Sequence, residues 1–418
     1  MKEQIHKRLS DEQVRAILEK YCCGEIKTAW ALDHLGIKRR QFFEWVKRYE
    51  QEPKNFSIAY KRKSINRKID KGTEDKILEG LMTEKKLIKD KRTPIQFYNY
   101  SFLQKTLTQK GIDVSVPTII NRAKKHGFYI PRKEKKAHDR EVITNYVGEL
   151  VQHDSSHHLF APSAQNKWYL ITSIDDCSRF ILYGNLFETE SSWKHIEALE
   201  YVCLNTGVPF RYYTDSHSIF RFIQPRDSFY RKHIAQDDET DPQWRRVLRD
   251  LKVDVTHALS PQAKGKIERP YRWMQDHLVR ICARENIRLL SEAREALKKE
   301  LNHYNYQQVH STTKEIPYRR LQQHLKQKKS LFRPFKIPQP YLSTKDIFCL
   351  RIERTTDSYR KISLLGLELR LPINPHEKVE LRMSPSSKEG MTDLRIWHKM
   401  KLADVKLVKT SDLKGINF

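Results

Sequence analysis

The sequence lacks both the cysteine spacing of a zinc module and the apolar runs of a membrane protein. None of its six cysteines forms a C-x-x-C pair, which excludes a zinc ribbon or a disulfide framework and favours reduced, mostly buried thiols. No segment approaches the roughly 18 to 20 apolar residues of a membrane span, and residues 1–20 are charged. A Gly-x-Ser-x-Gly hydrolase motif is also missing. We therefore expect a cytoplasmic protein with no membrane partner.

Positive charge is abundant and unevenly distributed. The formal net charge is +27. Residues 1–140 carry 34 Lys and Arg against 18 Asp and Glu, residues 141–310 carry 22 against 23, and residues 311–418 carry 23 against 11. Basic flanks around a neutral centre favour a nucleic-acid partner, because cationic side chains release the counterions condensed on a polyanion. The alternative is a basic surface that serves only solubility.

The N-terminal segment has the pattern of a helix-turn-helix. Ser10 and Gln13 form a capping box that starts a helix, and Gly36 separates a second helix from a third that begins at Lys38. This pattern predicts DNA binding, although three-helix cores with a basic face also bind proteins. The expected core residues are Ala29, Leu32, Leu35, Ile37, Phe42, Trp45 and Val46, which leaves Lys38, Arg39, Arg40 and Gln41 facing outward.

A second helical unit repeats this logic without convincing sequence similarity. Gly111 ends one helix, Ser115 caps the next with Pro117 in its first turn, and that helix ends at Gly127. Basic segments flank the unit and either contact phosphates or act only as solvated tethers. The candidate DNA-contact residues in these segments and in the second unit are Arg62, Lys63, Arg67, Lys68, Arg122, Lys124, Lys125, Arg132 and Lys133.

The periodicity changes near residue 142. Short runs rich in β-branched and aromatic residues predict strands at 150–152, 168–174, 179–186 and 210–213, with a helix at 192–205 before the last strand. Such an alternation implies a mixed α/β domain. Alternating apolar residues after 348 predict a small β-barrel with Arg351, Arg354, Arg360 and Lys361 available to phosphates.

These patterns divide the chain into seven segments. The expected helix-turn-helix domains are 1–60 and 73–130, and the basic linkers are 61–72 and 131–145. The α/β core is 146–310, a connector is 311–340, and the β-barrel is 341–418.

Three acidic residues in the core are the strongest functional signal. Asp154 and Asp215 each follow a predicted strand, and Glu268 lies in the first turn of a helix that begins near Lys266, since Pro270 is tolerated only in an opening turn. Singly, each Asp could simply cap a turn. Carboxylates that converge from two strand ends and a helix can hold a pair of Mg²⁺ ions, which is the requirement of phosphodiester chemistry. Four neighbouring basic residues are candidate DNA contacts: Lys264, Lys266, Arg269 and Arg272. Arg272 could instead form an ion pair with Glu268, four residues before it.

The order and setting of these acids resemble the DDE transposase and retroviral integrase superfamily. The stretches 213–220, 260–269 and 275–278 are similar, more narrowly, to the ISNCY group of bacterial insertion-sequence transposases. Only residues 146–310 carry specific motifs, while the flanking likeness lies in domain order. Asp215 and Glu268 have 52 residues between them, longer than in retroviral integrases, and no His pair precedes a Cys pair as in the integrase zinc module.

The resemblance implies an RNase H-like catalytic core with a mixed sheet, in which Asp154, Asp215 and Glu268 bind two Mg²⁺ ions, with Mn²⁺ as a substitute. It implies a bacterial, nucleoid-associated enzyme that binds terminal inverted repeats, cleaves DNA and joins it to a target as a homodimer or higher assembly. The alternative is a catalytically silent DNA-binding regulator. Asp175 and Asp176 could be additional ligands, but the resemblance places them in a structural turn. His153, His157 and His158 lack the spacing of a zinc site.

Overall fold

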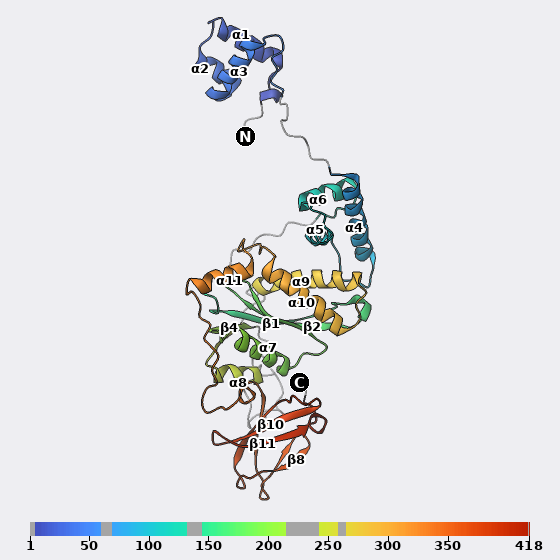
Figure 1. Cartoon of the computed structure of the whole chain (residues 1–418), viewed down its shortest axis with the longest axis vertical. Helices are drawn as coiled ribbons and strands as arrows, with labels where there is room; N and C mark the ends of the chain where they lie inside the picture. The colour runs from blue at the N-terminus through green and yellow to red at the C-terminus, as the bar shows by residue number, and fades with distance from the viewer. Residues whose placement is uncertain (1–4, 60–68, 132–143, 215–241, 258–264, 417) are drawn as a thin grey trace, which may run out of the picture. The chain divides into compact units, whose positions relative to one another are not determined.

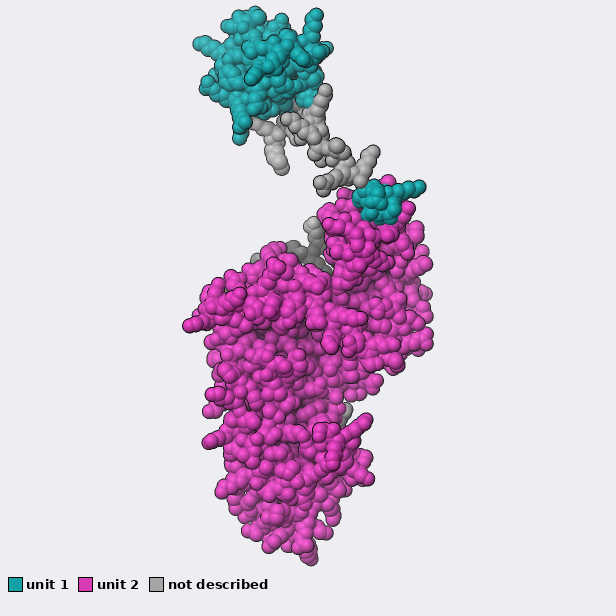
Figure 2. Space-filling view, viewed as in Figure 1, with its two compact units in different colours: residues 1–74 teal, residues 75–418 magenta. Residues whose placement is uncertain are grey.

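The structure is a computed structural model that describes two compact units. It covers residues 5–59, 69–131, 144–214, 242–257, 265–416 and 418, and for His6 and residues 265–270 it describes the backbone only. Contacts between residues divide the chain into residues 1–74 and residues 75–418 (Figure 1, Figure 2). No helix in the covered ranges is both long enough and apolar enough to cross a membrane.

Three helices form the first unit. They are α1 (Asp11–Cys22), α2 (Thr28–Leu35) and α3 (Arg39–Gln51), after a 3-10 turn η1 (Ile5–Lys7). The predicted capping box is confirmed, because Ser10 Oγ accepts from the Gln13 N–H at 3.3 Å and Gln13 Oε1 accepts from the Ser10 N–H at 2.9 Å. Gly36 ends α2 with a φ of 63°, a left-handed conformation that glycine adopts without a Cβ penalty.

The core of this unit differs from the prediction at one position. Leu35 and Phe42 are fully buried as expected, and they pack with Val14. Ala29, however, is exposed, and Ala31 is buried in its place. Because side chains one helical turn apart share a face, Ala31 and Leu35 belong to the same inward stripe of α2, and position 29 does not.

Helix α4 (Lys71–Lys89) begins at the end of the first unit and leads into α5 (Tyr100–Gln109) and α6 (Val116–Lys125). Ser115 caps α6 with Pro117 in the first turn, as the sequence predicts. Gly80 on α4 packs so closely against Leu103 on α5 that an added Cβ would clash with it. Glycine at this position therefore permits the close packing of α4 and α5.

The central domain contains a five-stranded mixed sheet in the order β3-β2-β1-β4-β5. Strand β2 (Trp168–Asp175) is antiparallel to β1 (Val151–His158) and β3 (Ile181–Phe187). Strand β4 (Arg211–Thr214) is parallel to β1 and to β5 (Asp254–His257). The mixed sheet expected from the resemblance is therefore present.

Strand β1 is longer than the sequence predicts. It was expected to stop at Gln152, but it continues to His158 with Asp154 opposite Thr172 of β2. The polar residues 154–158 give no strand signal of their own. Pairing with the apolar strand β2 extends β1 through them. Pairing with β4 does end early, at Gln152 opposite Tyr213. Asp154 therefore lies just beyond the point where β1 loses its parallel neighbour.

Helices cover both faces of the sheet (Figure 1). On one face, α7 (Ser192–Asn205) and α8 (Gln243–Asp250) pack in an apolar cluster that includes Trp193, Leu199 and Trp244. On the other face, α9 (Gly265–Arg284) and α10 (Leu290–Tyr306) pack around Met274 and Leu297. The short turn η2 (Pro162–Ala164) lies beside α9. The sheet is thus buried between two helical layers, as a sheet with parallel strands requires.

The C-terminal strands form an open sheet. After α11 (Pro317–Lys326) and η4 (Thr344–Asp346), a four-stranded antiparallel sheet has the order β11-β10-β9-β6, and β7 and β8 form a separate hairpin. The predicted closed barrel is therefore not confirmed, because alternation along a strand does not specify whether a sheet closes. The bounds are β6 (Leu350–Thr355), β7 (Lys361–Leu364), β8 (Leu367–Arg370), β9 (Lys378–Pro385), β10 (Met391–His398), β11 (Lys401–Lys409) and η5 (Thr410–Asp412).

Arg351 corrects one expectation about this region. Its guanidinium was expected to be available to phosphates, but the residue is 2% exposed and its Nη2 donates to Asp250 Oδ2 at 2.6 Å. Asp250 ends α8, so the pair ties the C-terminal sheet to the central domain. Arg354, Arg360 and Lys361 are exposed as expected.

Candidate active site

Asp154 is the one predicted catalytic residue whose side chain is described. It is half-buried in β1, and its Oδ1 accepts a hydrogen bond from the Ser155 N–H at 3.0 Å. Its neighbours His153 and Ser155 point to the other face of the sheet, since side chains alternate along a strand. The carboxylate of Asp154 therefore belongs to the face that α9 covers.

Helix α9 is hydrogen-bonded to β1 at Asp154 and at Ser156. The buried Tyr271 hydroxyl donates to the backbone oxygen of Asp154 and accepts from Thr172 Oγ1 at 2.8 Å. Further along α9, Gln275 Nε2 donates to Ser156 Oγ at 2.6 Å. Burial and the charge of Asp154 raise the pKa of Tyr271 well above its ordinary value. The tyrosine hence remains a proton donor and holds α9 against the strand that carries Asp154.

Glu268 and Asp215 lie next to these elements in the chain. Position 268 is in the first turn of α9, three residues before Tyr271, and its side chain lies outside the described set. Strand β4 ends at Thr214, whose Oγ1 is 3.2 Å from His257 Nδ1 on β5, and Asp215 follows beyond the described residues. Among the side chains that are described, no group of three or more His, Cys, Asp and Glu could hold a metal. The complete triad stays a prediction.

A hydrogen-bonded ring of side chains next to Asp154 was missed by the sequence reasoning. His153 and His195 are buried, with His153 Nε2 and His195 Nδ1 at 2.8 Å. Glu190 accepts from His195 Nε2 at 3.0 Å and also from Ser155 Oγ. Nothing in the sequence pairs residue 153 with a histidine 42 positions away. Only the packing of α7 on β1 brings them together.

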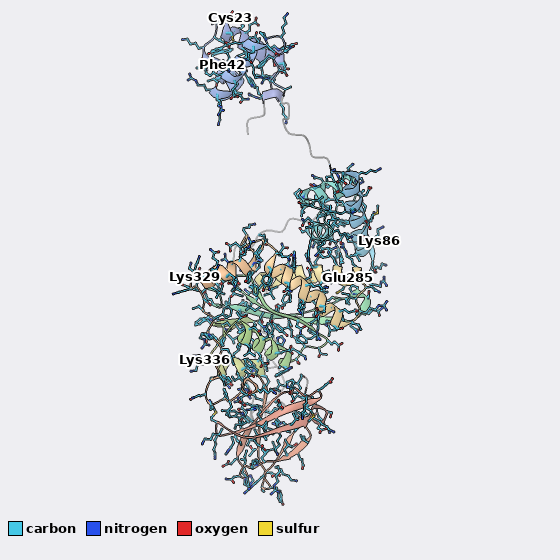
Figure 3. All side chains as sticks on the ribbon, viewed as in Figure 1. Cys23, Phe42, Lys86, Glu285, Lys329 and Lys336 are labelled. Carbon is cyan, nitrogen blue, oxygen red and sulfur yellow. The ribbon has the colours of Figure 1, made fainter. Side chains whose placement is uncertain are left out.

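Helix α9 also carries a buried ion cluster that joins it to α4 and the segment before α5. Arg280 and Glu84 form an ion pair in which both side chains are 0% exposed. Arg280 Nη2 also donates to Phe97 O at 2.7 Å and to Asp276 Oδ1 at 2.8 Å. Burial opposes ionisation of Asp276, but the contacts with Arg280 outweigh it and lower the pKa of the acid. Figure 3 labels Lys86 on α4 and Glu285 just after α9, which mark the two helices.

A second ion cluster joins α5 to α9 and α10. Lys105 Nζ lies 2.5 Å from Glu300 Oε1, and His277 Nδ1 lies 3.0 Å from Glu300 Oε2. Burial of Glu300 is outweighed by these hydrogen bonds, so its pKa is lowered. The two ion clusters thus attach α4 and α5 to α9, the helix that carries position 268 in its first turn.

The predicted DNA-contact residues fall into two groups. Those with described side chains lie on helix surfaces. In the first unit Lys38, Arg39, Arg40 and Gln41 are all exposed at the start of α3, and Arg40 pairs with Glu44 at 3.2 Å. Lys124, Lys125 and Arg272 are exposed, and Arg122 is half-buried. The remaining predicted contacts lie outside the described residues or side chains: Arg62, Lys63, Arg67, Lys68, Arg132, Lys133, Lys264, Lys266 and Arg269.

Asp175 and Asp176 stabilise the turn after β2. The fully buried Asp175 accepts from the N–H groups of Gly148 at 2.8 Å and Ser178 at 2.7 Å. Asp176 accepts from Arg179 Nη1 at 3.0 Å. Ser178 and Arg179 belong to the turn after β2 and Gly148 precedes β1, so these contacts support the structural interpretation of both acids.

The buried Asp175 makes stability depend on pH. Desolvation raises the pKa of Asp175 from 3.8 to about 6, although hydrogen bonds from Ser178 and Gly148 oppose the shift. Because the unfolded chain ionises first as pH rises, this contribution to stability is complete below about pH 4 and is lost through pH 6, on the order of 3 kcal/mol. Urea unfolding between pH 4 and 7 should show this loss in the native chain and not in Asp175→Asn. An identical pH dependence in both proteins would contradict the assignment.

Sequence comparison gives this chain two transposase relatives. No family model matches the chain. The chain is 26% identical over 304 residues to a Sinorhizobium fredii protein named as the transposase y4bF, which covers 71% of this chain and 62% of that protein. It is 31% identical over 176 residues to the transposase for insertion sequence IS1202 of Streptococcus pneumoniae, which covers 41% of this chain and 36% of that protein. The chain thus spans less than two thirds of the length of these relatives.

Two solved structures are similar to the chain at lower sequence identity than these transposases. A simian T-cell lymphotropic virus intasome chain shares 15% identity with a TM-score of 0.31, covering 73% of this chain and 94% of that chain. The HTLV-2 integrase catalytic core, solved with magnesium, shares 17% identity with a TM-score of 0.29, covering 43% and 97%. The sequence similarities confirm the resemblance to bacterial transposases that the motifs predicted.

Proposed function

We propose that this chain is a DNA transposase that binds the terminal inverted repeats of an insertion sequence, cleaves at its ends and transfers the cut strand. The observation that carries the proposal is the attachment of α9 to β1 at Asp154 through Tyr271. Position 268 precedes Tyr271 by three residues on this helix, and Asp215 follows the strand that pairs with β1. Asp154 and position 268 therefore belong to elements that are hydrogen-bonded to each other, and Asp215 follows the end of β4 in the sequence.

The residues fit a divalent metal. Asp154 is a half-buried carboxylate rather than a structural acid such as Asp175, and carboxylate oxygens are the ligands that Mg²⁺ prefers. Asp154, Asp215 and Glu268 would hold two Mg²⁺ ions, or Mn²⁺ in their place. When bound, such a pair supplies the positive charge that activates the attacking oxygen and stabilises the departing 3′ oxygen.

The chain's own groups would position these acids. Tyr271 fixes the backbone at Asp154 by donating to its carbonyl. Gln275 donates to Ser156, which is the next residue of β1 on the same face as Asp154. Because both contacts come from one helix, the distance between position 268 and Asp154 is set by rigid elements. Preorganised ligands of this kind lower the cost of assembling a catalytic site.

DNA contacts would come from the helical units. The exposed residues Lys38, Arg39, Arg40 and Gln41 at the start of α3 suit a major-groove contact, since recognition helices read bases with their N-terminal residues. Lys124 and Lys125 would contact phosphates. Joining two ends requires paired active sites, so a homodimer or higher assembly would form on DNA.

Metal-dependent cleavage of end DNA tests this function. The purified full chain would be incubated with labelled duplexes that carry the ends of the surrounding element, in Mg²⁺, Mn²⁺ or EDTA. We expect nicks that expose 3′-hydroxyl groups at the ends in either metal and none in EDTA, because the chemistry needs the ions. A scrambled duplex of equal length controls for non-specific nicking.

Binding without cleavage would overturn the enzyme assignment. If the chain retards end duplexes in a gel shift but cuts them in neither Mg²⁺ nor Mn²⁺, the silent-regulator alternative is favoured. Equal cleavage in EDTA and Mg²⁺ would reject the metal-dependent mechanism.

A further inference from the structure

The backbone of Asp154 closes a ring of buried and partly buried hydrogen bonds. From Ser155 the ring passes to Glu190, then to His195 and His153, and it returns to Ser155 along the strand. Asp154 is the residue between the two ends. Glu190 precedes α7, so the ring joins that end of α7 to β1 on the face opposite α9.

A chain of hydrogen-bond donors that ends at Glu190 satisfies the ring. The Glu190 carboxylate can only accept, so His195 donates through Nε2–H and its Nδ1 accepts from His153 Nε2–H. His153 Nδ1 then accepts from Ser173 Oγ–H at 2.8 Å. Each ring nitrogen then has a hydrogen-bond partner, as side chains that are 1% and 0% exposed require.

His153 packs against two aromatic rings. Its ring stacks on Trp244 of α8, with ring centroids 5.6 Å apart and planes at 12°. Tyr212 of β4 meets it edge-on, with centroids 6.0 Å apart. Trp244 and Tyr212 also contact each other edge-on, with centroids 5.4 Å apart, so the imidazole packs against a pair of aromatic rings while it is hydrogen-bonded to His195 of α7.

The hydrogen-bonded ring lies on the part of β1 that is no longer paired with the parallel strand β4. Pairing with β4 ends at Gln152, and from Asp154 onward β1 is paired with β2. Ser155 is bonded to Glu190 within this segment, while Tyr271 bonds to the Asp154 carbonyl from the α9 side. The backbone at Asp154 is thereby held from both faces of the sheet.

We propose that Glu190, acting through Ser155 and through the His195–His153 pair, is a positioning residue that sets the backbone of Asp154 for metal binding. This inference rests on the proposed function of Asp154. Glu190 serves as a double hydrogen-bond acceptor, and its negative charge is not needed for that task. A carbonyl oxygen also accepts two hydrogen bonds, so glutamine can replace glutamate in the ring.

The contrast between Glu190→Ala and Glu190→Gln tests the proposal. Mn²⁺ affinity would be measured by isothermal titration of the full chain without DNA, beside amide hydrogen exchange of a peptide that covers residues 151–158. We expect Glu190→Ala to weaken Mn²⁺ binding about 10- to 100-fold, the usual cost of losing an outer-shell partner. Exchange in the peptide should accelerate, whereas Glu190→Gln should match the native chain in both measurements.

Controls separate this proposal from the proposed function. Glu197→Ala removes an α7 acid that accepts from Tyr183 at 3.2 Å outside the ring, and it should change neither readout. If Glu190→Ala does not fold, Ser155→Ala breaks one link of the ring and should still accelerate exchange. If hydrogen exchange in the 151–158 peptide is unchanged in the alanine variants, the positioning role is overturned. It is also overturned if Glu190→Gln weakens Mn²⁺ affinity as much as Glu190→Ala does. Hydrogen exchange needs no DNA cleavage, so a chain that cuts no DNA would sink the proposed function alone.

Discussion

Asp154→Asn is expected to reduce metal-dependent DNA cleavage by about 10³-fold or more while end binding survives. An amide lacks the negative charge that a divalent cation requires, and metal stabilisation of the transition state amounts to several kcal/mol, of which about 4 kcal/mol corresponds to 10³-fold. The fold should persist, because the remaining amide oxygen can still accept from the Ser155 N–H. Single-turnover cleavage assays and gel shifts measure the two effects separately. Glu268→Gln should lose activity to a similar degree.

Two matched substitutions serve as controls. Asp254→Asn changes an exposed acid on β5, and Glu285→Gln changes an exposed acid just after α9 (Figure 3). Neither should alter cleavage. Persistent cleavage in both Asp154→Asn and Glu268→Gln would show that the triad is assigned to the wrong residues.

Arg280→Met is expected to lower the free energy of unfolding of the second unit by about 3 to 5 kcal/mol. Removing one partner of a buried ion pair leaves the other charge without compensation. Here Glu84 is 0% exposed and, of its described ion-pair partners, would keep only Arg284, and Asp276 and the Phe97 carbonyl also lose a donor. Urea unfolding followed by hydrogen exchange in peptides from α4 and α9 would measure the loss where it occurs.

An exposed pair between α4 and α5 provides the comparison. Arg92 and Asp90 lie 2.9 Å apart with side chains 79% and 31% exposed, so Arg92→Met should change the free energy by less than about 0.5 kcal/mol. The double variant Glu84→Leu with Arg280→Met should recover much of the loss, since an apolar pair often replaces a buried ion pair at little cost. Equal effects of Arg280→Met and Arg92→Met would contradict the burial argument.

Local signals in the sequence predicted the helices well. The Ser10 capping box, the Gly36 turn and the Ser115 cap each depend on residues within one helical turn, and each is observed. Helix α7 has the predicted bounds, Ser192–Asn205, because its start and its apolar stripe are both encoded locally. Motif likeness also led to the transposase resemblance that the sequence comparisons confirm.

Long-range pairing accounts for what could not be predicted. The polar half of β1 is a strand only because β2 pairs with it. Strand β5 was missed because it is a short edge strand, Asp254–His257, without clear alternation. The ring through Glu190 and the burial of Arg351 depend on partners in other elements, so residue type alone gave Arg351 the wrong role.

The ion pair between Glu84 and Arg280 also affects the order of events during synthesis. The two residues are 196 positions apart, so at about 5 to 20 residues per second the ribosome makes Glu84 roughly 10 to 40 s before its partner. Until α9 emerges, the nascent α4–α6 segment has an acid with no Arg280 to neutralise it. Helix α9 also carries position 268 in its first turn, so the ribosome makes this turn only seconds before it makes Arg280.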